Sequence, residues 1–418
     1  MNGTLGQAIL IKAPERINRK MRVYLDNAAT TAVRPEVIEE MMPYFTQYYG
    51  NASSVHMYGQ EAKKGLDIAR DRVAKALNAE PQEIIFTAGG TESDNTVLFG
   101  VAKKYANKGK HIITTTVEHH AILHSCEQLE KEGFRVTYLP VDEYGRVSAQ
   151  QVRDAICDDT ILVSIMFANN EIGTIMPIAE IGEVCNEKKV LFHTDAVQAV
   201  GHIPVDVKAM HIDMLSLSGH KFHGPKGVGV LYVKKGLKLP SLIVGGAQER
   251  TRRAGTENLP GIVGLGKAIE LATAEMDKNA QKQIKLRDKL INGILEIPDT
   301  RLNGHPTDRL PNNVNISIRY IEGESILLCL DMEGIAASSG SACTSGSLDP
   351  SHVLLAIGLS HGVAHGSVRL TLSEYTTEEE VDYVIDVIKK TTKRLRDMSP
   401  IYNPSDIQCT KGSCSTCD

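Results

Sequence analysis

The sequence has no long run of basic residues and no long run of apolar residues. Over its 418 residues, acidic side chains outnumber lysine and arginine by 51 to 46, and the formal net charge is −5. A polyanion-binding surface would need clustered basic residues interleaved with aromatic ones, so we expect no nucleic acid partner. No stretch approaches the roughly 18 apolar residues that a membrane-spanning helix needs, so we expect no membrane association.

Cysteine is also sparse. Eight cysteines are spread along the chain, and three of them, Cys409, Cys414 and Cys417, fall in the last ten residues. This distribution is not a disulfide framework, and reduced thiols with catalytic or metal-binding roles fit it better. Residues 1–20 hold only a short apolar run, which is too short for a secretory signal, so we expect a cytoplasmic protein and a dispensable leader before Met21.

Strand and helix patterns alternate through the first part of the chain. This alternation indicates an α/β fold with a mostly parallel sheet that is covered by helices on both faces. The predicted strands are 83–87, 111–116, 135–139, 161–166, 190–193, 214–218 and 228–233. The predicted helices are 35–49, 60–77, 91–104, 121–132, 148–156 and 178–188.

A different pattern follows this alternation. A long helical run over 260–295 leads into an α+β region, with strands near 313–318 and 367–372 and helices at 323–330, 350–357 and 377–396. We therefore expect a large domain of residues 34–272 and a smaller domain formed by 1–33 and 273–399. Residues 400–418 are polar, and we expect them to form a flexible tail that carries the terminal cysteines.

Lys221 lies in an unusual setting, between small, hydroxylic and imidazole neighbours that include Ser218, Gly219 and His220. Only a neutral amine attacks a carbonyl, and a partly desolvated lysine beside another cation is more readily neutral. The segment therefore suits a Schiff-base lysine. Taken alone, it equally suits a glycine-rich turn with solvated lysines.

Polar residues follow several of the predicted strands, and in an open α/β sheet the ligand binds beyond the carboxyl ends of the strands. Gly90 and Thr91 lie between a strand and a helix, where free N–H groups suit a phosphate. Asp195 follows a buried strand and would need a cationic partner, such as a protonated pyridine nitrogen, to remain ionised. Alternatively, Asp195 caps the N-terminus of a helix. His119 and Asn170 follow two further strands, so the set indicates one cleft.

Nine motifs occur in the order typical of one enzyme family: Tyr24–Thr31, Gly90–Ser93, Glu118–His119, Asn169–Gly173, His193–Gln198, Ser218–Lys221, Arg253–Thr256, Ser338–Cys343 and Ser367–Arg369. With these motifs, which span roughly residues 22–398, the chain resembles a group I cysteine desulfurase of the nitrogen-fixation and iron–sulfur assembly type. That resemblance implies the fold of the fold-type I pyridoxal 5′-phosphate enzymes, which is aminotransferase-like. It also implies a homodimer.

The resemblance further implies roles for individual residues. Lys221 would form the Schiff base with pyridoxal phosphate and later move the substrate α-proton, while Asp195 would keep the pyridinium protonated. Gln198 would hydrogen-bond the ring oxygen and His119 would stack on the ring. The remaining assignments are the phosphate ligands Gly90, Thr91, Ser218 and His220, the phosphate ligand Thr256 from a second subunit, and the carboxylate ligands Asn170 and Arg369.

Cys343 would carry the sulfur chemistry. It lies in a stretch of small residues without helical or strand periodicity, which indicates a mobile loop. The family mechanism implies that its thiolate takes the sulfur of L-cysteine, leaving L-alanine, and passes it to an iron–sulfur scaffold or another acceptor. His119 is a candidate acceptor for the thiol proton.

The terminal cysteines have the C-x4-C-x2-C spacing of three ligands in plant-type [2Fe–2S] ferredoxins. A cluster there would need a fourth ligand, from Cys343, a partner or another subunit. The same cysteines could instead relay persulfide sulfur or have no role.

Two other functions are also compatible with the sequence. A selenocysteine lyase or an aminotransferase would use Lys221 and Asp195 without needing Cys343. A cluster-carrying binding protein would act through the terminal cysteines and would not need Lys221.

Overall fold

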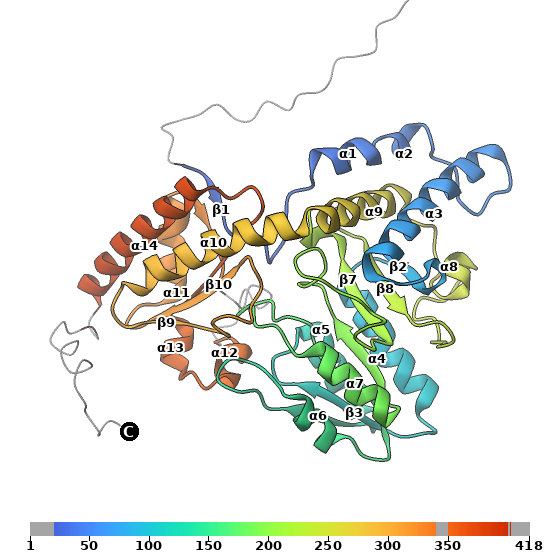
Figure 1. The fold of residues 1–418 in the computed structure, drawn as a ribbon, viewed down its shortest axis with the longest axis horizontal. Coiled ribbons are helices and arrows are strands. Elements are labelled where there is room, and N and C mark those ends of the chain that lie inside the picture. The colour runs from blue at the N-terminus through green and yellow to red at the C-terminus, as the bar shows by residue number, and fades with distance from the viewer. Residues whose placement is uncertain (1–20, 340–349, 400–401, 403–418) are drawn as a thin grey trace, which may run out of the picture.

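A seven-stranded sheet forms the centre of the larger part of the molecule in the computed structural model, which describes residues 21–339, 350–399 and 402 (Figure 1). Across the sheet the strands are β2 (Ile84–Thr87), β8 (Gly229–Val233), β7 (Met214–Ser218), β6 (Leu191–Asp195), β5 (Thr160–Ser164), β3 (His111–Thr115) and β4 (Arg135–Leu139). From β7 to β4 all neighbours are parallel, whereas β8 is antiparallel to both β7 and β2. The predicted mostly parallel sheet is thereby confirmed.

Helices cover both faces of this sheet. Successive strand residues point to opposite sides, and the apolar residues on each side pack against a different set of helices. On β2, Ile85 packs with α4 (Gly90–Tyr105) and α5 (His120–Lys131), whereas its neighbours Ile84 and Phe86 belong to the core on the other face. That second core includes residues of α3 (Met57–Leu77), α6 (Ala149–Ala155), α7 (Ile178–Lys188) and α9 (Leu259–Ala274). The sheet is therefore the middle layer of a three-layer structure.

Short elements complete this part of the chain. They are α1 (Pro35–Met41), α2 (Pro43–Thr46), α8 (Gln248–Thr251) and the 3₁₀ turns η1 (Pro81–Glu83) and η2 (Gly219–Lys221). The turn η2 follows directly on β7 and carries Lys221.

A separate apolar core lies in the second part of the structure. The strands β9 (Thr300–Leu302), β10 (Asn313–Ile318) and β12 (Ser367–Thr371) form an antiparallel sheet with β10 in the middle. The short strands β1 (Val23–Tyr24) and β11 (Ile335–Ala336) pair in parallel beside it. The helices of this part are α10 (Met276–Leu295), α11 (Gly323–Met332), α12 (His352–Ala356), α13 (His361–His365) and α14 (Glu378–Met398).

Two predicted helices are interrupted, and the interruptions have local causes. The run predicted over 260–295 is two helices, because the backbone of Glu275 leaves the helical conformation between them; the Glu275 carboxylate accepts a 2.9 Å hydrogen bond from Arg34. The run predicted over 35–49 breaks near Pro43, which has no amide hydrogen with which to continue α1. In Figure 1, α9 and α10 form the link between the two parts of the molecule.

The chain folds so that residues near its start contact both parts. Asp26 forms a parallel bridge with Thr371 of β12, and the Thr31 amide donates to the His220 carbonyl oxygen at 3.0 Å. The segment 26–31 therefore lies between η2 and β12. In the described part of the chain, no helix combines the length and the apolar character that crossing a membrane requires.

Candidate active site

A cavity of about 400 Å³ opens where the carboxyl ends of the parallel strands meet the segment 26–31 and β12. It brings together ten of the residues predicted to form the site: Gly90, Thr91, His119, Asn170, Asp195, Gln198, Ser218, His220, Lys221 and Arg369. These residues come from chain segments as much as 279 positions apart (90 to 369). The convergence of all but Arg369 follows from the large sheet, since the carboxyl ends of parallel strands share one edge, whereas Arg369 comes from β12 of the smaller sheet.

Lys221 ends the turn η2 and reaches into this cavity. Its Nζ donates hydrogen bonds to the carbonyl oxygens of Ala28 at 2.6 Å and Ala29 at 2.9 Å. Both acceptors belong to the segment 26–31, so the start of the described chain fixes the position of the amine. A lysine held by two carbonyl oxygens is aimed and partly desolvated, as a Schiff-base lysine must be.

Asp195 is the last residue of β6 and is buried. Burial raises the pKa of its carboxyl to about 6, although the Val197 amide and the nearby Lys221 charge act in the opposite direction. A cation placed against this carboxylate would favour its ionised form. The protonated nitrogen of a pyridine ring is such a cation.

Asp94 is a second buried carboxyl in the cavity wall. Burial first, and the neighbouring Asp195 charge second, raise the pKa of Asp94 well above its usual range. Its Oδ1 has no hydrogen-bond partner among the described residues. That oxygen lies 3.7 Å from Nε2 of the buried His193, so Asp94 belongs to a buried polar cluster as well as to the cavity wall.

His119 caps the N-terminus of α5, and its Nδ1 accepts a hydrogen bond from the Ala121 amide at 3.1 Å. Burial first, and the Lys221 charge second, lower the pKa of His119 to about 4, so the ring is neutral at neutral pH. With Nδ1 accepting, the proton lies on Nε2. Gln198 lies in the cavity wall too, and its Nε2 donates to the Ala28 carbonyl oxygen at 3.1 Å.

The N-terminus of α4 forms one end of the cavity. Gly90 is its first residue, no side chain caps the helix, and a Cβ on Gly90 would lie 2.6 Å from Val197 Cγ2. Exposed amide groups and the positive end of the helix dipole suit an anion such as a phosphate. Ser218 and His220 line the cavity as well, and His220 Nδ1 lies 3.1 Å from the Thr30 hydroxyl.

Arg369 of β12 closes another side of the cavity and is 3% exposed. Its Nη1 donates to the Asn170 carbonyl oxygen at 2.9 Å, and its Nη2 pairs with Asp26 Oδ1 at 3.1 Å. Its Nε has no hydrogen-bond partner among the residues described. A buried guanidinium with an unused donor fits a carboxylate ligand.

Thr256 does not line this cavity; its side chain is exposed in the segment after α8. That segment is tied back to α4, because Arg253 Nε pairs with Glu92 at 2.9 Å. Four further predicted residues, Cys343, Cys409, Cys414 and Cys417, lie outside the described residues.

Two members of the site, Asp94 and Asp26, had no role in the sequence-based prediction. For Asp94 a signal exists, since it falls four residues after Gly90 and therefore on the same, sheet-facing side of α4. Asp26 is part of the Tyr24–Thr31 motif, but its pairing with Arg369 depends on a contact over 343 positions.

The residues of the cavity fit pyridoxal phosphate. The helix terminus at Gly90 provides for a phosphate, the Asp195 carboxyl for a pyridinium, Lys221 for the aldehyde carbon and Arg369 for the carboxylate of an amino acid. The buried Nε of Arg369, which has no hydrogen-bond partner among the described residues, belongs to the same cavity.

Comparison with known proteins places this site in a family. Residues 23–384 match the model of the family described as Aminotransferase class-V. The chain is 60% identical over 379 residues to "Cysteine desulfurase IscS" of Methanosarcina thermophila, which covers 91% of this chain and 94% of that protein.

Solved structures agree with this match. A "NIFS-LIKE PROTEIN" is 41% identical with a TM-score of 0.84, covering 90% of this chain and 99% of that one. The structure titled "SspA in complex with cysteine" is 38% identical with a TM-score of 0.76, and the match covers 85% of this chain and 100% of that chain. The chain therefore belongs to the class-V aminotransferase family and, within it, to the group I cysteine desulfurases, which depend on pyridoxal phosphate.

Proposed function

We propose that Lys221 and Cys343 divide the cysteine desulfurase reaction between them. Lys221 Nζ removes the proton from the substrate Cα, and the Cys343 thiolate attacks the sulfur of L-cysteine. In the second step an S–S bond forms on Cys343 and the substrate C–S bond breaks. The electron pair of that bond stays on the substrate carbon, which takes up a proton, so that L-alanine leaves and the sulfur remains as a persulfide.

Pyridoxal phosphate, when bound, supplies an electron sink for the bonds at the substrate Cα. The protein contributes the groups that hold it. Of the residues that line the cavity, Asp195 would pair with the ring nitrogen, Gln198 would hydrogen-bond the ring oxygen and His119 would stack on the ring. Because the desolvated Asp195 carboxyl favours a cationic partner, cofactor binding and ionisation of Asp195 support each other.

His119 is better suited to donate a hydrogen bond than to take up the Cys343 proton. Accepting a proton at Nε2 would require the other neutral tautomer, which would give up the bond from the Ala121 amide to Nδ1. The lowered pKa of about 4 also makes the ring a weak base. We therefore assign to His119 the stacking position and an Nε2–H donor.

At the phosphate, we assign Gly90, Thr91, Ser218 and His220 of this chain and the partner subunit's Thr256. A homodimer is supported by exposed apolar side chains on α2, on the segment between α2 and α3 and on the loop before α8, since large apolar side chains gathered at a surface mark interaction sites. They include Phe45 at 56%, Tyr49 at 64%, Val55 at 89% and Val244 at 87% exposure. The loop after Val244 leads to Thr256.

Arg369 and Asn170 bind the substrate carboxylate in this proposal. The relative titled "SspA in complex with cysteine" supports cysteine as the ligand, and the unpaired Nε of Arg369 supplies a donor for its carboxylate. Sulfur then passes from Cys343 to an iron–sulfur scaffold protein or another acceptor.

The observation that carries the proposal is the convergence of Lys221, Asp195 and Arg369 in one cavity. To test it, wild type and the variants Lys221→Ala, Cys343→Ser and Cys329→Ser are supplied with L-cysteine, and alanine and protein-bound persulfide are measured. Lys221→Ala should form neither product and Cys343→Ser should form no persulfide. Cys329→Ser, which changes a thiol outside the cavity, should behave like wild type. Alanine formation at the wild-type rate by Lys221→Ala would refute the proposal.

A further inference from the structure

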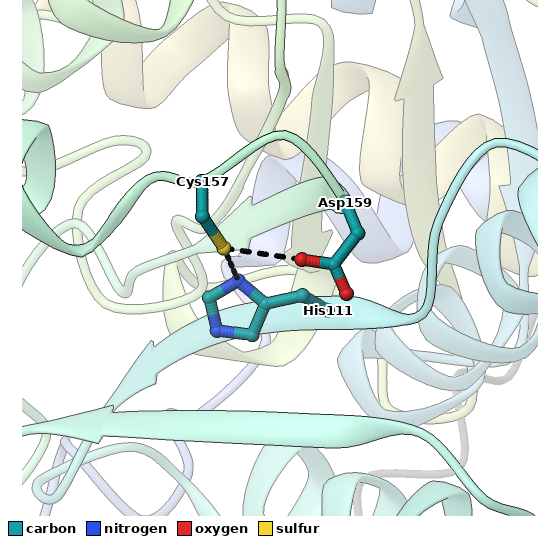
Figure 2. Close-up of side chains that lie close together, drawn as sticks. All are labelled: His111, Cys157 and Asp159. Carbon is teal, nitrogen blue, oxygen red and sulfur yellow. Dashed lines mark hydrogen bonds between the residues drawn. The ribbon is translucent and has the colours of Figure 1, made fainter.

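Three potential metal ligands meet at the amino edge of the large sheet, the edge opposite the cavity that holds Lys221. His111 is the first residue of β3, and Cys157 and Asp159 lie on the loop between α6 and β5 (Figure 2). The cysteine desulfurase reaction gives none of these three side chains a role.

The three ligand atoms lie close together. Cys157 Sγ is 3.1 Å from His111 Nδ1 and 3.2 Å from Asp159 Oδ1, and all three ligand atoms lie within 4.8 Å of one another. In a tetrahedral zinc site with bonds of about 2.0–2.3 Å, neighbouring ligand atoms are roughly 3.3–3.6 Å apart. The two pairs that involve Cys157 therefore need to open by only a few tenths of an ångström to enclose such an ion, and the pair of His111 and Asp159, within 4.8 Å, must adjust to the same spacing.

His111 is held as a metal-binding histidine is usually held. Its ring is fully buried, and Nε2 lies 2.8 Å from the Thr137 hydroxyl of β4. When Nε2–H donates to Thr137, the lone pair of Nδ1 points at Cys157, which is the tautomer that a metal at Nδ1 requires. Thr160 lies 2.8 Å from the same Nδ1 and can turn its hydroxyl proton away.

The other two ligands are accessible. Cys157 is exposed and the Asp159 side chain is 48% exposed, so an ion can reach them from solvent. Arg135 now donates to both, at 3.1 Å to Cys157 Sγ and 2.9 Å to Asp159 Oδ1. Its side chain is 54% exposed, so it can swing away from the sulfur while keeping a solvated position near the carboxylate.

We propose that His111, Cys157 and Asp159 bind one divalent transition metal ion of the zinc class. Imidazole, thiolate and carboxylate are the ligand types that zinc takes in proteins, and three protein ligands leave a fourth position for water. On binding, the Cys157 thiol releases its proton to solvent, and the metal bonds to Sγ, to the Nδ1 lone pair and to Oδ1. The ion would tie the loop before β5 to the start of β3.

Zinc itself is the probe in the test. The full chain with bound cofactor is prepared with Cys343, Cys409, Cys414 and Cys417 replaced by serine, because those thiols would also take up zinc. Zinc affinity and stoichiometry are measured against a chromophoric chelator in this background and after the further changes Cys157→Ser, Asp159→Asn and Cys329→Ser. Cys329 is the matched control, since its sulfur also lies near an arginine, 3.0 Å from Arg394 Nη2.

The background chain should bind one equivalent of zinc, and Cys157→Ser and Asp159→Asn should each weaken binding at least about 10-fold, as loss of a ligand does. Cys329→Ser should leave the affinity unchanged. Thr137→Val, which removes only the partner of His111 Nε2, should weaken binding by about 10-fold. Arg135→Gln should strengthen it, because the guanidinium then no longer competes for the sulfur.

Cobalt(II) adds a structural readout. If Cys157 is a ligand, the visible bands of tetrahedral cobalt should appear in the background chain and be lost in Cys157→Ser. Absence of a zinc equivalent in the background chain would overturn the proposal. So would zinc binding that Cys157→Ser and Asp159→Asn leave unchanged.

Discussion

Gly90 occupies the tightest position in the cofactor cavity, and replacing it with alanine should weaken cofactor binding. The new Cβ would lie 2.6 Å from Val197 Cγ2, about 1 Å closer than carbon atoms in van der Waals contact. To relieve the overlap, either the N-terminus of α4 or the Val197 side chain must shift. Both line the cavity at the proposed phosphate position.

The expected loss of cofactor-binding free energy can be taken from the cost of overpacking in protein cores. An added carbon in a close-packed site typically costs about 1–3 kcal/mol. If this cost falls on the cofactor-bound state, the dissociation constant of pyridoxal phosphate should rise roughly 5- to 150-fold.

The assay is a titration of the apoenzyme with pyridoxal phosphate, followed by absorbance. Gly100→Ala is the matched control, because Gly100 lies in the same helix and a Cβ there would meet Leu239 only at 3.4 Å. The double variant Gly90→Ala/Val197→Ala removes the methyl group that the new Cβ meets, so it should regain affinity relative to Gly90→Ala. Wild-type affinity in Gly90→Ala, or no recovery in the double variant, would show that this contact does not shape the site.

Three further predictions concern buried charges. Burial raises the pKa of Glu118 to about 8, so its contribution to stability is complete below about pH 4 and is lost as the pH rises through about 8. Glu118→Gln should therefore gain stability relative to wild type between about pH 5 and about pH 9 in urea unfolding, and a constant difference would contradict the burial argument. Arg70→Met should lower the free energy of unfolding by about 3–5 kcal/mol, because it leaves the buried Glu249 carboxylate without its cationic partner at 2.6 Å and with only the Phe86 amide, among the described residues, as a donor at 3.0 Å; a loss below about 1 kcal/mol would count against it. Arg369→Lys should raise KM for cysteine about 10-fold or more with a smaller change in kcat, since lysine lacks the planar fork that binds a carboxylate, and an unchanged KM would remove Arg369 from the substrate site.

Much of the fold could be predicted because its signals are local. Buried strands such as 111–116 and helices such as 178–188 have hydrophobic periodicities that the chain keeps in the structure, as β3 and α7 show. The alternation of strand and helix then predicts the parallel sheet, and the parallel sheet predicts that residues after different strands meet at one edge.

The alternation of strands and helices does not predict that β8 runs antiparallel to β7. Only residues 219–228 separate β7 from β8, and a parallel crossover needs about a dozen residues or more. The connection length was therefore the usable signal. The break at Glu275 has no such signal, since no proline or glycine marks it, and the side chain meets Arg34, 241 positions away.

The candidate site was predictable to a similar degree. Asp195 and Lys221 follow strands, so their positions predict one cleft and the family resemblance implies their roles, whereas the pairings of Arg369 with Asp26 and of Asp94 with His193 are tertiary contacts. Such contacts depend on which segments lie side by side, which one sequence does not specify. The His111 cluster is of the same kind, since its members lie 46 and 48 positions apart in the chain (111 to 157 and 111 to 159).

The central claim is that Cys343 receives the sulfur that the cofactor site releases. The most direct measurement is peptide mass mapping of the wild-type holoenzyme after one turnover with L-cysteine, with persulfides trapped by an alkylating reagent. The extra sulfur atom should be found on the peptide that contains Cys343. Sulfur found instead on the Cys409–Cys417 tail or on Cys157, with Cys343 unmodified, would contradict the account.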